Sequence, residues 1–401
     1  MSSITPQHIK KQTEEIINEV ILIRRYLHQH PELSFKEYNT AAYVQKKLTE
    51  WKIPFIAGIA ETGILATIEG RNPSKKTITL RADIDALPIQ EENNIDFCSK
   101  NHGIMHACGH DVHAACLLGA AKILFNHKEK FEGSIQLLFQ PGEEKLPGGA
   151  SLVIKEGVFA NKAPASVLGQ HVYPQLEAGK VGFKKGMYMA SADELYLTVK
   201  GKGGHAALPS DYINPLLIAS EILIRLNELF MNPQKHIIPN NIPTVLAFGK
   251  IEGRGATNVI PAEVKIEGTF RTFNEEWRKE AHQILKNTAH KIATEMGGDC
   301  DFNIEVGYPF LVNDTTVTEV AIKAAEEFLG KENVVDLDLR MTSEDFAFYT
   351  QLYPSCFYRL GVATKNAKNS GLHTPTFNID ESAMNTGVGL FTWIALKLLE
   401  K

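Results

Sequence analysis

The chain has few cysteines, and they are poorly placed for pairing or for a structural metal site. Five occur in 401 residues, an odd number at irregular spacing. A disulfide framework needs an even set, and a zinc finger needs a second closely spaced pair such as CxxC, which this sequence lacks. The low number and irregular spacing of the cysteines exclude a disulfide-stabilised domain and a zinc-finger module. They predict reduced thiols and a cytoplasmic location.

Long hydrophobic runs and strong charge are also missing. No apolar stretch approaches the roughly 20 residues that a transmembrane helix needs, and the polar N-terminus MSSITPQHIKKQTEEII does not fit a secretory signal. A net charge of −5 gives no reason to expect nucleic acid or an anionic membrane as partner. The remaining composition, 44% hydrophobic and 22% charged, is that of a globular protein. At this length we predict two domains.

Strands and helices alternate in the N-terminal part of the chain. The expected elements are a helix, a buried strand entering a loop at Arg81 or Ala82, a helix and two strands, at residues 5–28, 77–88, 113–125, 133–144 and 165–174. This alternation predicts an α/β fold with a mostly parallel sheet covered by helices on both faces. Sites in such sheets gather at the carboxyl ends of the strands. Asp83, Glu143, Glu144 and His171 fall at or just past such ends, which is the first sign of a shared site.

The pattern changes between residues 183 and 298. A strand, an amphipathic helix, two strands and a charged helix are expected at 192–204, 213–230, 244–253, 261–273 and 274–296. This order predicts a compact α/β sandwich with an antiparallel sheet. We interpret 183–298 as an inserted domain within a catalytic domain formed by 1–182 and 299–401. The catalytic domain resumes with a helix after Asn313, a strand at 355–362 and a helix from about Asp380.

Metal-binding side chains crowd into the stretch MHACGHDVHAA (105–115). Four of the 14 histidines fall in or just before it: His102, His106, His110 and His113. The thiolate of Cys108 and the imidazole of His110 can face the same cation, and Gly109 lets the backbone turn tightly between them. With no second pair nearby, a metal bound here must take its other ligands from elsewhere. That pattern is typical of a catalytic site.

Two glutamates and two further histidines are candidates for those ligands. Glu143 and Glu144 follow an apolar strand and FQPG, where adjacent acids repel each other unless a cation lies between them. One carboxylate can ligate a metal while the other stays free as a proton shuttle. With His171 and His373, the set offers one thiolate, one carboxylate and three imidazoles, which suits two divalent cations with open positions for water. Such mixed ligands suit zinc, manganese, cobalt or nickel.

Seven motifs, in order over about residues 15–395, give the chain a specific resemblance. It resembles the dimetal amidohydrolase family of hippurate hydrolases, indole-acetyl-amino-acid hydrolases and N-acetyl-diaminopimelate deacetylases. These are relatives of aminoacylases and of two-metal carboxypeptidases. The motifs are MHACGHDVHAA, FQPGEEKLPGGA, GQHVYP, VKGKGGHAALP, TNVIPAEVKIEGTFRT, SEDFAFY and LHTP. The resemblance implies metal-dependent hydrolysis of the amide bond of N-acyl amino acids, in a catalytic domain with an inserted lid or dimerisation domain.

The resemblance also implies roles for individual residues. The expected metal ligands are Cys108, His110, Glu144, His171 and His373, with Cys108 as a candidate bridge. Glu143 is the expected general base. The position of Arg81 carries a metal-binding histidine in the wider clan; arginine cannot ligate, so the cysteine–histidine pair is expected to compensate. Asp83 is then expected to orient a ligand histidine.

The inserted domain carries the expected substrate-binding residues. By resemblance, His205 in GKGGHAALP reaches the oxyanion, often in a neighbouring subunit's site, so a homodimer or dimer of dimers through this domain is expected. Asn258 and Arg271 are candidates for holding a substrate carboxylate, although Arg271 fits an exposed strand position equally well. The motif SEDF (343–346) is expected near the pocket without an assigned role.

Three alternatives stay open at this point. A dipeptidase or carboxypeptidase of the same clan would use the same metals. A cysteine hydrolase would use Cys108 as nucleophile with a nearby histidine as base, which would leave Glu144, His171 and His373 without a shared purpose. A non-catalytic metal-binding protein derived from such an enzyme would not need Glu143 beside an intact ligand set.

Overall fold

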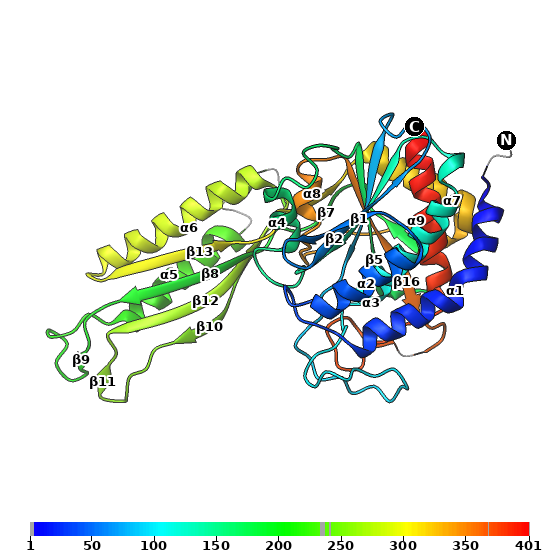
Figure 1. Cartoon of the computed structure of the whole chain (residues 1–401). Helices are drawn as coiled ribbons and strands as arrows, with labels where there is room; N and C mark the ends of the chain where they lie inside the picture. Colours follow the sequence, from blue (N-terminus) through cyan, green and yellow to red (C-terminus); the bar gives the residue numbers. More distant parts are fainter. Residues whose placement is uncertain (1–3, 233–236, 240–241, 368, 401) are drawn as a thin grey trace. The chain divides into compact units, whose positions relative to one another are not determined.

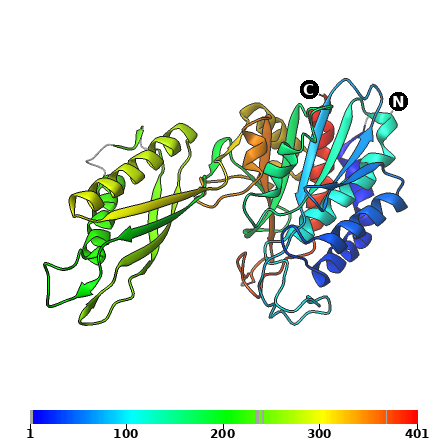
Figure 2. The same cartoon turned by 60° about the vertical axis from the view of Figure 1, so that its left-hand side comes forward.

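The computed structural model describes residues 4–232, 237–239, 242–367 and 369–400. The chain forms two compact units (Figure 1, Figure 2). The first unit comprises Met1–Tyr188, Val312–Leu339 and Asp345–Lys401, and the second comprises Met189–Leu311 and Arg340–Glu344. An insertion inside the first unit is what the sequence led us to expect. The second unit nevertheless extends to Leu311, about a dozen residues beyond the expected boundary at 298, and it also takes in 340–344.

An eight-stranded sheet forms the centre of the first unit. Its order is β1-β2-β4-β3-β5-β16-β6-β15. The strands are β1 (Phe55–Ile59), β2 (Gly63–Glu69), β3 (Thr77–Asp83), β4 (Ser134–Gln140), β5 (Ser166–Glu177), β6 (Val181–Phe183), β15 (Val334–Asp336) and β16 (Ser355–Ala363). The four central strands, β4, β3, β5 and β16, are mutually parallel, so the mostly parallel sheet is confirmed. Their carboxyl ends therefore lie at one edge of the sheet.

Helices cover both faces of this sheet. They are α1 (Pro6–Gln29), α2 (Tyr38–Glu50), α3 (His110–Asn126), α4 (Gly149–Lys155), α7 (Thr315–Leu329), α8 (Ala347–Thr350) and α9 (Ala383–Glu400), with short 3₁₀ turns at Lys128–Lys130 and Lys331–Asn333. The helices α1, α3, α7 and α9 pack together. On β16, the ring of Tyr358 lies 6.4 Å from that of Phe391 in α9, whereas the ring of Phe357 lies 4.9 Å from that of Phe346 beside α8. Because neighbouring residues on a strand point to opposite faces, α8 and α9 lie on opposite sides.

The second unit is a sheet with two helices on one face (Figure 1, Figure 2). Its antiparallel sheet has the order β10-β12-β8-β13. The elements are β8 (Asp193–Lys200), α5 (Pro215–Met231), β10 (Val245–Glu252), β12 (Glu263–Arg271), α6 (Glu275–Glu295) and β13 (Asp299–Val306), with a small hairpin of β9 (Gly204–His205) and β11 (Val259–Ile260). Both helices and the sheet contribute to one hydrophobic core. The strand β13 pairs with β8, which is why the unit extends past 298. The strands β7 (Gly186–Met189) and β14 (Leu311–Asn313), which pair, carry the chain out of and back into the first unit.

The structure corrects the expected end of one strand. We expected a loop from Arg81 or Ala82, but β3 continues to Asp83 and every residue in it is buried. A charged side chain in a buried strand normally argues against the strand. Here the guanidinium of Arg81 is satisfied by Asp83, Gln140 and Asp345 at 2.6–3.0 Å, so the strand can continue.

Two further predictions concern the thiols and the membrane. All five cysteines are free, as their irregular spacing predicted. Among the helices of the described residues, none has the length and apolar character that a membrane span requires.

Candidate metal centre and active site

The start of α3 places a thiol and an imidazole side by side. Gly109 adopts a left-handed conformation (φ 84°) as the N-cap of α3, and a Cβ there would lie only 2.6 Å from Cγ2 of Val172. Glycine is therefore required both by the turn and by the close approach to β5. The turn sets Cys108 just before the helix and His110 at its first position, and both side chains are buried.

The predicted ligands from four separate segments converge on Cys108. Its Sγ lies 3.4 Å from Nε2 of His171 and 3.3 Å from Nε2 of His373. Oε1 of Glu144 lies 3.2 Å from Nε2 of His373 and 3.9 Å from Nε2 of His110. The structure thus brings together the five residues that the sequence singled out as ligands.

His373 reaches this cluster from a constrained loop. It has φ 58°, the left-handed region that a non-glycine residue rarely adopts. Its backbone N–H donates to the carbonyl of Ala107 at 2.8 Å, which ties the loop to the segment just before Cys108. Unusual backbone conformations held in this way concentrate at functional sites.

Two buried atoms in the cluster indicate that a cation fits here. Among the described residues, Nε2 of His110 has no hydrogen-bond partner, and Oε1 of Glu144 makes no well-oriented hydrogen bond although Nε2 of His373 lies 3.2 Å away. Buried polar atoms rarely stay unpaired in proteins, because an unmade hydrogen bond costs about 1–3 kcal/mol. Both atoms belong to sets of thiol, imidazole and carboxylate groups close enough to share an ion. A borderline divalent cation matches this chemistry.

The electrostatics of the cluster also favour a bound cation. Burial, together with the nearby carboxylates of Glu144, Glu143 and Asp83, raises the pKa of the Cys108 thiol well above its usual value. Burial opposes charge on His110, but Asp83, Asp85 and Glu144 outweigh it and raise the pKa of this imidazole to about 10. The acidic groups therefore make the site attractive to positive charge, which a metal ion can supply.

Two aspartates of RADIDALP hold histidines in place, and each contacts a different histidine. Asp83 accepts from Nδ1 of His113 at 2.5 Å, and His113 is not among the predicted ligands. Oδ1 of Asp85 lies 3.2 Å from Nδ1 of the predicted ligand His110. Oδ2 of Asp85 also accepts from the backbone N–H of Glu144 at 2.9 Å. The sequence analysis did not identify Asp85 as a residue that orients a ligand. Its position two residues after Asp83 in the same motif could have indicated this role.

Glu143, the expected base, is buried next to the ligands. Its carboxylate belongs with His110 and Glu144 to one of the sets that could share an ion. Oε1 of Glu143 accepts the backbone N–H of Asp345 at 3.3 Å. A carboxylate so placed is suited to take a proton from a water molecule bound at the same centre.

The candidates of the second unit lie on its sheet and hairpin. His205 is exposed on β9, opposite Val259 on β11. The backbone N–H of Ala206 donates to the carbonyl of Asn258 at 3.0 Å, so His205 and Asn258 share this hairpin. Arg271, at the end of β12, is half-buried, and its Nη1 donates to the carbonyl of Met341 at 3.2 Å. Burial disfavours the charged form of Arg271 and lowers its pKa, a cost that a paired anion would offset.

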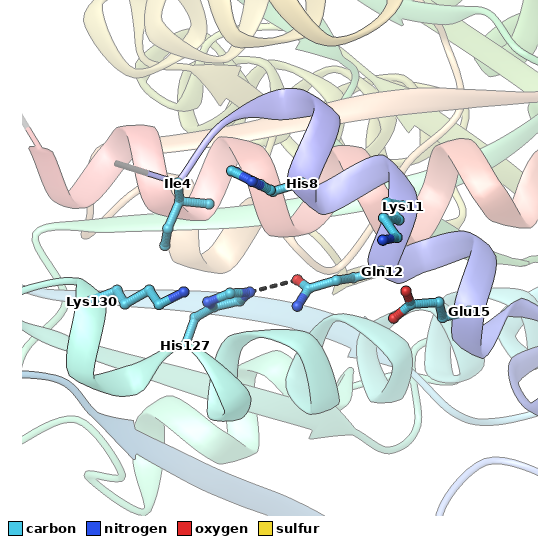
Figure 3. Close-up of a pocket in the computed structure, with 7 residues that line it drawn as sticks. All are labelled: Ile4, His8, Lys11, Gln12, Glu15, His127 and Lys130. Carbon is cyan, nitrogen blue, oxygen red and sulfur yellow. Dashed lines mark hydrogen bonds between the residues drawn. The ribbon is translucent and has the colours of Figure 1, made fainter. Parts of the chain in front are cut away.

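A separate cavity of about 220 Å³ lies against the start of α1 (Figure 3). It is lined by Ile4, His8, Lys11, Gln12, Glu15, His127 and Lys130. None of these residues was predicted for the site. Nε2 of His127 contacts Oε1 of Gln12 at 2.5 Å, a contact that joins the end of α3 to α1. We interpret this hollow as a packing feature between two helices.

Comparison with known proteins agrees with the geometry. Residues 79–397 match the model of peptidase family M20/M25/M40. The chain is 38% identical to N-acetyl-L-cysteine deacetylase of Bacillus subtilis over 91% of its own length and 85% of that protein. It is 33% identical to thermostable carboxypeptidase 2 of Saccharolobus solfataricus over 98% and 99% of the two chains. A dinuclear metal-binding M20 peptidase of Bacillus subtilis superposes with a TM-score of 0.81 at 32% identity, covering 96% and 99%.

The chain belongs to peptidase family M20/M25/M40 and is a hydrolase of the metallopeptidase type. The resemblance inferred from the seven motifs is confirmed, as is the expectation of an enzyme that binds divalent metal.

Proposed function

We propose that this protein hydrolyses the amide bond of N-acyl amino acids, with Glu143 as general base. The observation that carries the proposal is the convergence of Cys108, His110, Glu144, His171 and His373 beside the buried carboxylate of Glu143. The deacetylase relative supports an N-acyl substrate, and the carboxypeptidase relative keeps a peptidase activity as the alternative.

Each residue of the site has its own role in the proposed reaction. Bound divalent cations would lower the pKa of water and stabilise negative charge developing on the amide carbonyl oxygen. Glu143 takes the proton from the attacking water and returns it to the leaving amine, which departs as the free amino acid. Asp85 fixes the ring of His110 and the backbone of Glu144, so two ligands are oriented by one carboxylate. We propose zinc, manganese, cobalt or nickel as the metal, two ions per subunit, because the ligands mix sulfur, nitrogen and oxygen.

A substrate panel tests this proposal. Acetyl, benzoyl and indole-acetyl derivatives of several amino acids are compared with dipeptides of the same C-terminal residues, using metal-loaded enzyme. A free α-ammonium group beside divalent cations is repelled, so we expect kcat/KM for the best N-acyl substrate to exceed that for its dipeptide by about tenfold or more. Release of the amino acid is measured by derivatisation and chromatography. Faster cleavage of the dipeptides would instead establish the peptidase alternative.

We also propose that the protein forms a dimer, or a dimer of dimers, through its second unit. Three apolar side chains spaced seven residues apart on α5, Leu217, Ile224 and Met231, are 49–61% exposed. They form one stripe along the helix, and among the described strands β10 is an edge of the adjacent sheet. An apolar stripe beside an open edge suits isologous two-fold pairing.

In such a dimer, the exposed His205 would complete the partner's site. His205→Ala and Glu143→Ala are then each nearly inactive as homodimers. Co-refolding them in equal amounts makes about half of the dimers hybrid, and each hybrid has one intact site of two, so about a quarter of wild-type activity should return. Native mass spectrometry confirms that hybrids form. If hybrids form at every mixing ratio and activity stays at the parental level, His205 does not act across the interface.

A further inference from the structure

Glu143 and Glu144 lie on a loop between β4 and α4, and both ends of that loop contact one buried carboxylate. The loop begins after Gln140, whose Nε2 donates to Oδ1 and Oδ2 of Asp345 at 3.0 and 2.8 Å. It ends at α4, where the backbone N–H of Ala150 donates to Oδ2 of Asp345 at 2.9 Å. A single side chain therefore joins the segments that enter and leave the loop.

The same residue touches the loop at its centre. The backbone N–H of Asp345 donates to Oε1 of Glu143 at 3.3 Å. The side chain of Asp345 thus fixes the frame of the loop while its backbone contacts the carboxylate that we propose as the base. Asp345 is fully buried, so water does not compete for these hydrogen bonds.

Arg81 links this arrangement to the centre of the sheet. From β3, its guanidinium donates to Oδ2 of Asp83 and to Oδ1 of Asp345, each at 2.6 Å, and to Oε1 of Gln140 at 3.0 Å. A planar guanidinium can hold several acceptors at fixed angles, which an ammonium group cannot. Since Asp83 also holds His113, Arg81 connects the histidine-bearing helix α3 with the glutamate-bearing loop.

We propose that Asp345, held by Arg81, is a positioning residue that places Glu143 for proton transfer. The inference rests on the proposed function, because it takes Glu143 as the general base. A base that is displaced by about 1 Å loses much of its effect, since proton transfer needs close contact with the water. Within the part of the chain that the structure describes, the hydrogen bonds of the Asp345 side chain and backbone N–H go to Arg81, Gln140, Ala150 and Glu143 and not to a predicted metal ligand. Its loss should therefore affect the base more than the metal.

A double-mutant cycle on the full chain tests this proposal. Asp345→Asn keeps the shape of the side chain but removes the charge that pairs with Arg81. We expect kcat to fall by about tenfold or more with KM changed less than about threefold and with wild-type metal content. In a Glu143→Gln background, the same Asp345→Asn change should cost less than about twofold, because both changes remove one function. Equal losses in the two backgrounds, or no loss in the wild-type background, would overturn the proposal.

Hydrogen exchange provides a readout that does not depend on activity. The amide of Ala150 is protected by the Asp345 carboxylate, so its exchange should accelerate in Asp345→Asn. The matched control is Asp193→Asn in the second unit, which breaks a buried pair with Arg278. It should lower the melting temperature without accelerating exchange at Ala150 and without changing kcat by more than about twofold. An unchanged exchange rate at Ala150 in Asp345→Asn would show that the Asp345 carboxylate does not hold the loop between β4 and α4.

A second variant tests the same proposal if Asp345→Asn does not fold. Arg81→Lys keeps the buried positive charge but cannot hold Asp83, Gln140 and Asp345 at the same time. It should also lower kcat in a manner that depends on Glu143. Failure of the proposed function has a different signature, because Glu143→Gln alone would then keep wild-type activity.

Discussion

Glu143→Gln is expected to lower kcat by at least about two orders of magnitude, the lower part of the range for a general base. The amide of glutamine is close to the carboxylate in size, and it cannot accept a proton at neutral pH. The backbone N–H of Asp345 can still donate to its side-chain oxygen, so the loop should keep its conformation. Steady-state kinetics on an N-acyl amino acid give the loss, and elemental analysis should find wild-type metal content.

The neighbouring glutamate serves as the matched control. Glu144→Gln makes the same chemical change one residue further, at the carboxylate that lies 3.2 Å from Nε2 of His373. It should lower metal content as well as activity, because a neutral amide is a poorer ligand than a carboxylate. If Glu143→Gln loses metal and Glu144→Gln keeps it, the two roles have been exchanged. A different effect of the two substitutions on metal content would show that the position of each carboxylate, and not its charge alone, determines whether it binds metal or acts as the base.

The site could be predicted from sequence to the extent that its parts are local or come from strand ends. Cys108 and His110 are two residues apart at the start of one helix, so their convergence follows from the turn at Gly109. Glu144 follows the parallel strand β4, whose carboxyl end lies at the edge of the sheet where sites gather. His171 was expected at the end of its strand, but β5 continues past it to Glu177. His373 comes from a loop with an unusual backbone conformation, and the sequence offered it as an isolated histidine that gained support from the order of the motifs.

The supporting residues could not be predicted in the same way. The pairing of Arg81 with Asp345 joins positions 264 residues apart, and nothing in either local sequence indicates the other. For that reason, the strand β3 was predicted to enter a loop at Arg81 or Ala82, where the apolar pattern stops. Likewise, β13 was placed outside the inserted domain although DCDFNIEV alternates polar and apolar residues, and its pairing with β8 assigns it to the second unit. Local patterns reveal elements and ligands, whereas partners of buried charges depend on the tertiary fold.

Removal of the metal is expected to have the largest effect of all. Dialysis against a strong chelator, followed by removal of the chelator, should leave less than about 0.1% of activity, since losing even one group that stabilises developing charge costs about 10²–10³-fold. The metal-free protein should also melt at a lower temperature, because a ligand that binds only the folded state stabilises it. Nε2 of His110 then stays without a hydrogen-bond partner among the described residues, and the acidic groups around Cys108 lose the positive charge that balances them.

Restoration by different cations tests the chemistry of the ligand set. Zinc, manganese, cobalt or nickel should return activity to the metal-free protein, each to a different level. Magnesium and calcium are the matched controls with the same charge. They prefer oxygen ligands, and a site built from one thiolate, three imidazoles and one carboxylate should not hold them. Recovery with magnesium alone would mean that the ligands in use are the carboxylates and not Cys108, His171 and His373.

The same experiment separates the metal mechanism from a thiol mechanism at Cys108. A cysteine nucleophile needs a lowered pKa, usually from a nearby cation or a helix N-terminus. Here burial and the carboxylates of Glu144 and Glu143 raise the pKa of the thiol, so without a metal Cys108 is a poor nucleophile. With metal bound, its sulfur should be occupied as a ligand. Intact-mass analysis during turnover should therefore find no acylated protein. An acyl adduct on Cys108 in metal-free, active enzyme would replace the metal mechanism with covalent catalysis.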